Sequence, residues 1–333
     1  MKTTQIIFIF AIFSLSFAVD KTGTTAAKFL SIGPGSKAIA MGGAYTSIAD
    51  DASAMYWNPA GIVNMEQSQM LVNHTEWVAG INYDYIGFVM NLNTNSSFGV
   101  SLTALSMGEM EVTRYDNEVT GETFKAGSWA VGVSFASRLT DRFSIGFNGK
   151  FIREYIANEM STGIALDVGT LFDTPFGVRL GASIANFGPK LQMSGVDLLY
   201  PIDIDPAQQG DNESVVGEIT TDKFDLPLLL RVGISDEINL VSGTRCTWSI
   251  DANHPNDNTE YINIGVEVSL LDEMIFLRGG SKTIFLKDRE ETYTVGGGFK
   301  TSISGMSELT VDYAYETWNF LGNTQKFTIA ISF

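Results

Sequence analysis

Few side chains in this sequence are of the kinds that perform catalysis. The chain has two histidines, His74 and His254, and one cysteine, Cys246, among its 333 residues. A hydrolase needs a nucleophile, a histidine and an orienting acid at hydrogen-bond range, and no serine stands in a G-x-S-x-G turn. Two histidines also cannot form a histidine-rich metal site. We therefore expect no catalytic residue, no metal and no cofactor, and we do not expect an enzyme.

Carboxylates are concentrated in one segment, residues 195–225. Its acids are Asp197, Asp203, Asp205, Asp211, Glu213, Glu218, Asp222 and Asp225. Oxygen ligands at this density could bind calcium, but their spacing matches no EF-hand loop. The segment is therefore predicted to be a solvated acidic loop, with calcium binding left open.

The same segment contains an apolar stretch that is unusual for a surface loop. It consists of Leu198, Leu199, Tyr200, Pro201 and Ile202. Exposed apolar patches often mark contact sites. These five residues are our candidate surface for a partner or a ligand.

The chain is strongly acidic and begins like an exported protein. Its net charge is −17 and its pI is about 4.4, with no basic cluster to meet phosphates, which argues against a nucleic-acid partner. Residues 1–18 combine a basic start, the apolar run IIFIFAIFSLSFA and a small-x-small site ending at Ala18, which predicts a secretory signal peptide. Beyond them, no apolar stretch reaches the roughly 18 residues of a membrane-spanning helix.

Alternating apolar and polar residues predict strands in most of the remaining chain. In the last segment, TQKFTIAISF, one face carries Phe327, Ile329, Ile331 and Phe333, and small or polar residues occupy the other. A soluble sandwich also alternates. Here, however, the strands are about ten residues long, against about five or six in soluble sheets. A transmembrane β-barrel requires about 9–11 residues per strand.

The connections between these strands favour the membrane barrel. We expect fourteen strands, at residues 69–78, 83–92, 97–106, 126–138, 142–155, 162–173, 177–187, 225–235, 244–253, 259–270, 274–284, 291–302, 308–317 and 324–333. Every second connection is a tight turn and most others are longer and more polar, which is typical of outer-membrane barrels. The predicted fold is an all-β, 14-stranded antiparallel transmembrane barrel, located in the lipid of a Gram-negative-type outer membrane.

Residues 19–66 precede the first strand and do not alternate. Glycines and prolines interrupt them repeatedly. A segment of this length, placed before a barrel wide enough to hold water, can fold back into the lumen as a hatch. We therefore divide the chain into a signal peptide (1–18), a hatch (19–66) and a barrel (67–333).

The hatch contains the remaining candidate site residues. These are Gly42, Gly43, Asp50, Asp51, Asn58, Pro59 and Ala60. Asn58 before Pro59 favours a turn that joins the hatch to the first strand, and a hinge or gating point is the alternative. The two aspartates are expected to pin the hatch by pairing with a lumen-facing base such as Lys150.

The stretch GSKAIAMGGAYTSIADDASAMYWNPAG, residues 35–61, resembles the hatch of the fatty-acid-transporter (FadL) barrel superfamily, and more specifically its PorV/PorQ branch. Asp50-Asp51-Ala52 and Asn58-Pro59-Ala60 carry this resemblance. It implies a fourteen-stranded outer-membrane barrel with an internal hatch. For PorV-like members it also implies type IX secretion, in which the barrel binds the C-terminal domain of secreted cargo. The cargo then passes to surface attachment machinery that includes a sortase-like protease, and PorQ-like members are accessory barrels of the same system.

A second function fits the same barrel. Members that resemble FadL itself carry hydrophobic small molecules laterally into the membrane. Such a channel needs a kinked strand that opens the wall beside the hatch, and Gly99 in the third strand is the nearest candidate. Because no stronger kink is visible, we favour secretion over uptake. A purely structural barrel is the third interpretation.

Overall fold

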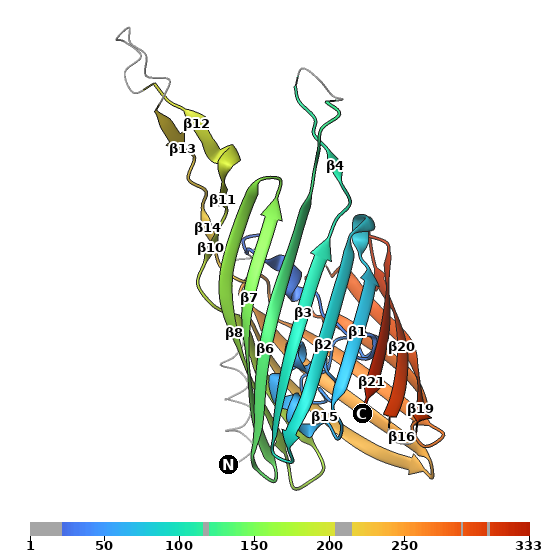
Figure 1. The fold of residues 1–333 in the computed structure, drawn as a ribbon. Coiled ribbons are helices and arrows are strands. Elements are labelled where there is room, and N and C mark those ends of the chain that lie inside the picture. The colour runs from blue at the N-terminus through green and yellow to red at the C-terminus, as the bar shows by residue number, and fades with distance from the viewer. Residues whose placement is uncertain (1–21, 116–119, 204–214, 288, 305–306) are drawn as a thin grey trace, which may run out of the picture.

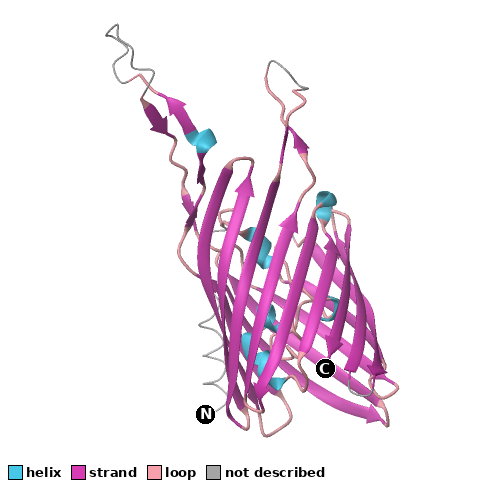
Figure 2. Ribbon diagram, in the orientation of Figure 1, coloured by secondary structure: helices cyan, strands magenta, loops and turns pink. Residues whose placement is uncertain are grey.

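A computed structural model describes residues 22–115, 120–203, 215–287, 289–304 and 307–333 as a closed β-barrel (Figure 1, Figure 2). Its wall consists of β1 (Gln69–Glu76), β2 (Asn82–Asn93), β3 (Ser96–Ser106), β6 (Ala126–Thr140), β7 (Phe143–Ile156), β8 (Glu159–Asp173), β9 (Arg179–Phe187), β15 (Leu229–Val241), β16 (Thr244–Pro255), β17 (Tyr261–Leu270), β18 (Ile275–Ile284), β19 (Glu291–Ser304), β20 (Ser307–Trp318) and β21 (Asn323–Ser332). Each strand pairs antiparallel with its neighbours, and β1 pairs with β21 to close the sheet. The predicted 14-stranded antiparallel barrel is confirmed.

The predicted strand ranges agree with the structure to within three residues, except for the eighth strand. That strand was expected at 225–235, whereas β15 spans Leu229–Val241. Its polar end continues as a hairpin with β16 because Arg245 forms a 3.0 Å ion pair with Glu237 across the two strands. Cross-strand pairs of opposite charge stabilise a β-ladder through polar residues that composition alone would assign to a turn.

The two faces of the wall strands differ as the alternation predicts. On β21, Phe327 and Ile329 are exposed on the outer surface, while Lys326 and Thr328 are buried on the inner one. Exposed apolar side chains recur on the outer face of the other wall strands. An apolar exterior of this kind is stable only in contact with lipid.

The two ends of the barrel also differ. At one end, which we call the turn end, the strands are joined by short turns, and β1 begins and β21 ends there. At the other, the loop end, β4 (Met110–Glu111) and β5 (Thr123–Phe124) extend one connection. The longest connection carries β10 (Leu191–Gln192), β11 (Ser194–Gly195), η4 (Val196–Leu198), β12 (Leu199–Pro201), β13 (Val216–Glu218) and β14 (Lys223–Phe224). Figure 1 shows both connections standing beyond the barrel rim.

Residues 22–66 lie inside the barrel, as the blue segment of Figure 1 shows, and we call them the hatch. They form η1 (Lys28–Ser31), α2 (Ser36–Ala40), α3 (Ala54–Trp57) and η2 (Pro59–Asn64), while η3 (Val78–Gly80) lies in the loop between β1 and β2. No helix in the described ranges is long and apolar enough to cross a membrane. The predicted signal peptide lies outside the described residues.

Candidate functional site

Glycines on the inner wall let the hatch backbone touch the strands. A Cβ added to Gly265 of β17 would lie 2.2 Å from the carbonyl oxygen of Met41, and one added to Gly280 of β18 would lie 2.2 Å from the amide nitrogen of Gly42. Across the lumen, a Cβ on Gly146 of β7 would lie 2.3 Å from the carbonyl carbon of Pro59. Real Cβ atoms do not approach backbone this closely, so the hatch is seated on positions that only glycine can occupy.

The paired glycines of the hatch turn the chain beside this wall. Gly42 and Gly43 have φ angles of 67° and 69°, a region in which glycine carries no side-chain penalty. The turn is fixed by buried bonds: Gly42 N–H donates to Thr294 Oγ1 at 3.0 Å, and Thr294 Oγ1 donates to the Ala40 carbonyl at 3.0 Å. The two glycines thus place hatch backbone directly against β18 and β19.

Asn58, Pro59 and Ala60 form a buried turn. The Asn58 side-chain oxygen accepts from the Ala60 amide at 3.2 Å and caps η2, with Pro59 at the first position of that helix. Its amide nitrogen donates to the carbonyls of Thr46 at 2.8 Å and Thr170 at 3.0 Å. One side chain therefore ties together two parts of the hatch and strand β8. The geometry supports a structural anchor.

Asp50 and Asp51 do not pair with Lys150, so that prediction is wrong. The Lys150 ammonium lies 2.8 Å from Asp167 on the neighbouring strand instead. Asp50 binds Lys37 of the hatch itself, at 2.7 Å, and accepts from the Tyr45 hydroxyl at 2.6 Å. The misassignment arose because sequence alone did not show that the short helix α2 directs its own lysine toward Asp50.

The two aspartates have opposite electrostatic environments. Burial acts to raise the pKa of Asp50, but the charge of the Lys37 ammonium and the hydrogen bonds from Lys37 and Tyr45 outweigh it and lower that pKa to about 2. Burial and the neighbouring Asp50 charge raise the pKa of Asp51, which accepts from the Ser53 amide at 2.8 Å and its hydroxyl at 2.5 Å. Asp50 is therefore an anion that stabilises the fold of the hatch. Asp51 accepts the hydrogen bonds that fix the turn before α3.

A wall carboxylate that we did not single out from the sequence also binds the hatch. Asp251 of β16 accepts from the backbone amides of Tyr45 and Thr46, both at 2.9 Å. This residue lies at an inward position in the alternating strand, where a buried acid signals a bonded partner. Inward acids and inward glycines are thus the sequence signal that could have located the hatch contacts.

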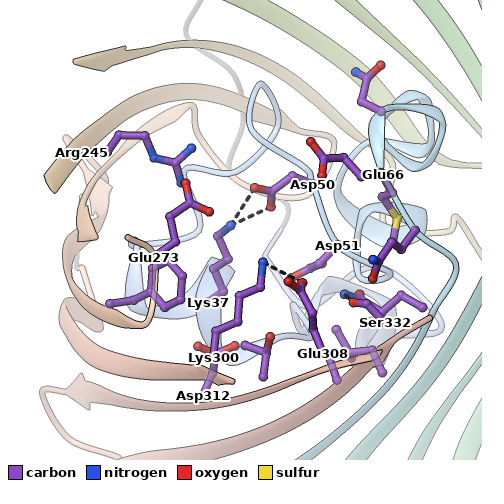
Figure 3. Close-up of a pocket in the computed structure, with 18 of the residues that line it drawn as sticks. Lys37, Asp50, Asp51, Glu66, Arg245, Glu273, Lys300, Glu308, Asp312 and Ser332 are labelled. Carbon is purple, nitrogen blue, oxygen red and sulfur yellow. Dashed lines mark hydrogen bonds and ion pairs between the residues drawn. The ribbon is translucent and has the colours of Figure 1, made fainter. Parts of the chain in front are cut away.

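A charged cavity of about 420 Å³ opens at the turn end, between the hatch and the wall (Figure 3). Lys37 and Asp50 of the hatch face Arg245 and Glu273 of the wall, whose side chains lie 3.3 Å apart. On the other side Lys300 pairs with Glu308 at 2.7 Å. The basic groups labelled here are neutralised by neighbouring acids, so the cavity is polar and suits no hydrophobic ligand.

Farther from the turn end than this cavity, little open space separates the hatch from the wall. The described residues leave a cavity of about 20 Å³ between Met55 and Tyr56 of the hatch and Tyr85 and Asn148 of the wall. A volume of this size holds about one water molecule. Met55 of the hatch and Tyr85 of the wall are fully buried, so the hatch packs closely against the wall at this level.

The register of the wall does not shift at Gly99, so the position proposed for a kink is wrong. One of the places where the register does shift lies between β8 and β9. Gly99 lies in unbroken ladders, opposite Val89 and Ser134. The register of β8 against β9 shifts beyond Val168, where Asn186 adopts a φ of 65°. Sequence reasoning missed this site because asparagine tolerates the left-handed conformation without any glycine to mark it.

Residues of the long connection between β9 and β15 cover the irregular part of the wall between β8 and β9. β11 pairs with the first two residues of β8, and the Leu191 side chain lies so close to Gly163 that a Cβ added there would be 2.1 Å from it. Leu191 also belongs to a buried cluster with Phe29, Leu30 and Leu226. The wall irregularity is thus closed from inside by apolar packing.

The predicted contact residues lie at the loop end, in a two-stranded ribbon that we define as residues 196–202 and 215–219. Leu198 ends η4, Leu199, Tyr200 and Pro201 form β12, and Ile202 follows it. β12 pairs only with β13 among the described residues. Leu199 and Tyr200 are exposed, as are Val216 of β13 and Ile219, which follows that strand.

The remaining reactive residues lie apart from one another. His74 pairs with Asp84 at 2.7 Å on β1 and β2, and His254 with Glu260 at 2.9 Å at the loop end. Within the described ranges, no group of three or more histidine, cysteine or acidic residues could hold a metal ion. Of the eight acids considered for calcium, Asp205, Asp211 and Glu213 lie outside those ranges.

A closed antiparallel barrel with an apolar outer face is the architecture of an outer-membrane β-barrel. The family described as "Type IX secretion system protein PorV" matches residues 17–198 of this chain. Because this match covers more than half of the chain, the protein belongs to the PorV family. It is therefore an outer-membrane barrel of a secretion-system family. Comparison with curated proteins gave no significant match.

Solved structures with a similar fold include two toluene transporters and a FadL homologue. The Ralstonia pickettii toluene transporter TbuX is 13% identical, covers 90% of this chain and 97% of its own, and has a TM-score of 0.57. A Pseudomonas aeruginosa FadL homologue is 12% identical over 96% of this chain and 99% of its own, with a TM-score of 0.54. The Pseudomonas putida toluene transporter TodX is 12% identical over 95% and 98%, with a TM-score of 0.57. At these identities the likeness concerns the fold.

Proposed function

We propose that this barrel acts in type IX secretion by binding the C-terminal domain of secreted cargo and handing it to the surface attachment machinery. That machinery would include a sortase-like protease. Membership of the PorV family supports this proposal. In this function the protein has no chemistry of its own and works by recognition.

One structural observation carries the proposal. The hatch backbone lies against wall glycines, and hatch side chains such as Ile39, Tyr45 and Met55 are fully buried, so the hatch occupies the part of the lumen in which it lies. The apolar ribbon, in contrast, stands beyond the rim of the barrel (Figure 2). A partner therefore meets the protein at the loop end, and we assign Leu198, Leu199, Tyr200, Pro201 and Ile202 to the contact surface.

Co-purification tests the proposal. The tagged chain is extracted from its native outer membrane in mild detergent, purified and analysed by mass spectrometry. We expect secreted proteins that share a C-terminal β-domain, together with a sortase-like protease. Recovery of the barrel alone from actively secreting cells would refute cargo binding.

Uptake of a hydrophobic small molecule is the second candidate function, and one observation favours it. The irregular wall at Asn186 adjoins the buried apolar cluster around Leu191, so an opening there would connect an apolar interior to lipid. Extraction of the purified barrel with organic solvent would test it. A stoichiometric fatty acid or aromatic hydrocarbon in the extract would favour uptake, and an extract containing only membrane phospholipid would exclude it.

A further inference from the structure

The two outer edges of the ribbon differ in what they offer a partner. Ile202 N–H donates to the Val215 carbonyl and Ile219 N–H to the Leu198 carbonyl, both at 2.9 Å. In an antiparallel ladder such bonded pairs alternate along the strand. The backbone groups of Tyr200 therefore face β13, whereas those of the residues on either side of it face outward.

The outer edge of β12 is blocked and that of β13 is open. On β12 the outward positions are Leu199, whose amide already bonds to Val196 in η4, and Pro201, which has no N–H. Proline at this place is a common protection of a strand edge. On β13 the outward positions are Val216 and Glu218, and no described residue pairs with that side of the strand.

The ribbon has no core of its own. Tyr200 and Ile202 pack over Gly217 on one face, while Leu199 and Val216 lie on the other. Val216 is 63% exposed and Ile219 56% exposed. Two strands alone are marginally stable in water, because they bury little apolar surface. An added strand would cover these side chains and satisfy the β13 edge.

The charge of the surrounding segment selects the kind of strand that fits. Residues 188–228 contain eight acids and two lysines, a net charge of −6. A second copy of this chain would bring the same negative charge and is disfavoured. A strand that alternates apolar residues with lysine or arginine satisfies both the apolar faces and the charge.

We propose that the β13 edge, at Val216 and Glu218, is a strand-addition site for a β-strand of the cargo domain that carries apolar and basic residues. Strand addition derives affinity from main-chain hydrogen bonds and specificity from the alternating side chains. This inference rests on the proposed function, since it names how cargo is recognised. In this inference the open β13 edge binds the partner, and the blocked β12 edge protects the ribbon against pairing with a wrong strand.

The test uses the full chain in detergent and a fluorescent ten-residue peptide that alternates valine and lysine. Fluorescence anisotropy measures the affinity for wild type and three variants. Val216→Pro removes one outward N–H without touching a ladder bond or any charge, and we expect at least tenfold weaker binding. Pro201→Ala restores an N–H on the opposite edge and should leave the affinity unchanged. Glu218→Lys combined with Asp222→Lys reduces the negative charge and should weaken binding about tenfold.

The outcomes separate this inference from the proposed function. No binding of the peptide to wild type, or equal binding to wild type and Val216→Pro, would overturn strand addition at β13. If Val216→Pro disturbs the ribbon itself, the charge-reversed variant still decides, because unchanged binding there would also overturn the inference. Co-purification of secreted cargo uses only the wild-type barrel and none of these variants, so it tests the proposed function separately.

Discussion

Replacing one wall glycine by alanine should loosen the hatch without disturbing the barrel. A Cβ on Gly280 would lie 2.2 Å from the amide nitrogen of Gly42 and 2.4 Å from the carbonyl carbon of Met41. Both atoms are backbone and cannot rotate away. An ordinary contact begins at about 3.4 Å, so the hatch must move by about 1 Å.

The expected free-energy cost follows from that displacement. Overpacking of a close-packed interior costs about 1–3 kcal/mol. A shift of about 1 Å also weakens the two bonds that join Gly42 and Ala40 to Thr294, each worth about 1 kcal/mol. The Gly280→Ala variant should therefore favour the undocked hatch by about 3 kcal/mol, a factor of roughly 100.

Hydrogen exchange of the hatch amides measures this change directly. We expect exchange of the segment around Gly42 and Tyr45 to accelerate roughly 100-fold in Gly280→Ala, while the wall strands keep their protection. Gly279→Ala is the matched control, because that glycine is adjacent on β18 and its added Cβ would meet only one atom, 4.0 Å away. Equal hatch exchange in both variants and wild type would refute the argument that glycine seats the hatch.

Three further changes test the hatch contacts and the ribbon. Asn58→Ala removes the amide that donates to the carbonyls of Thr46 and Thr170 and should destabilise the hatch by about 2–4 kcal/mol, seen as faster hatch exchange with an unchanged barrel melting profile. Because the pKa of Asp50 is lowered to about 2, its ion pair with Lys37 stabilises the hatch above about pH 4 and is lost as the pH falls toward 2; exchange measured across this range should show the loss, and Lys37→Met should abolish the transition. Replacing residues 196–219 by a short glycine–serine linker should leave barrel stability unchanged in thermal denaturation but remove co-purified cargo, and cargo retained by this variant would exclude the ribbon as the contact surface.

The barrel was predictable from sequence because its determinants are local. Alternation along TQKFTIAISF indicates which face of the strand contacts lipid. Strand length and the alternation of short turns with long loops indicate that the sheet closes into a barrel. The eighth strand was misplaced because residues 236–241, which composition assigns to a turn, continue β15 and pair with β16. The alternation of apolar and polar residues predicts the wall strands, but it does not predict the ion pairs between them.

The contacts of the hatch were less predictable because they depend on which wall strand lies opposite. Asp50 was expected to pair with a lumen-facing base such as Lys150, but its partner is Lys37 of the same segment. Asp251 binds two hatch amides from 205 and 206 residues away, a distance at which no local pattern operates. The irregularity at Asn186 likewise arises from register between strands, which only the folded sheet defines.

The most direct measurement of the central claim is the location of secreted proteins in cells whose only copy of this chain lacks the ribbon. Quantitative proteomics of the cell surface and the medium would compare these cells with cells that carry the full chain. The account predicts that proteins sharing a C-terminal β-domain disappear from the surface while the truncated barrel remains at normal abundance in the outer membrane. Normal surface attachment of those proteins in the ribbon-deleted cells would contradict it.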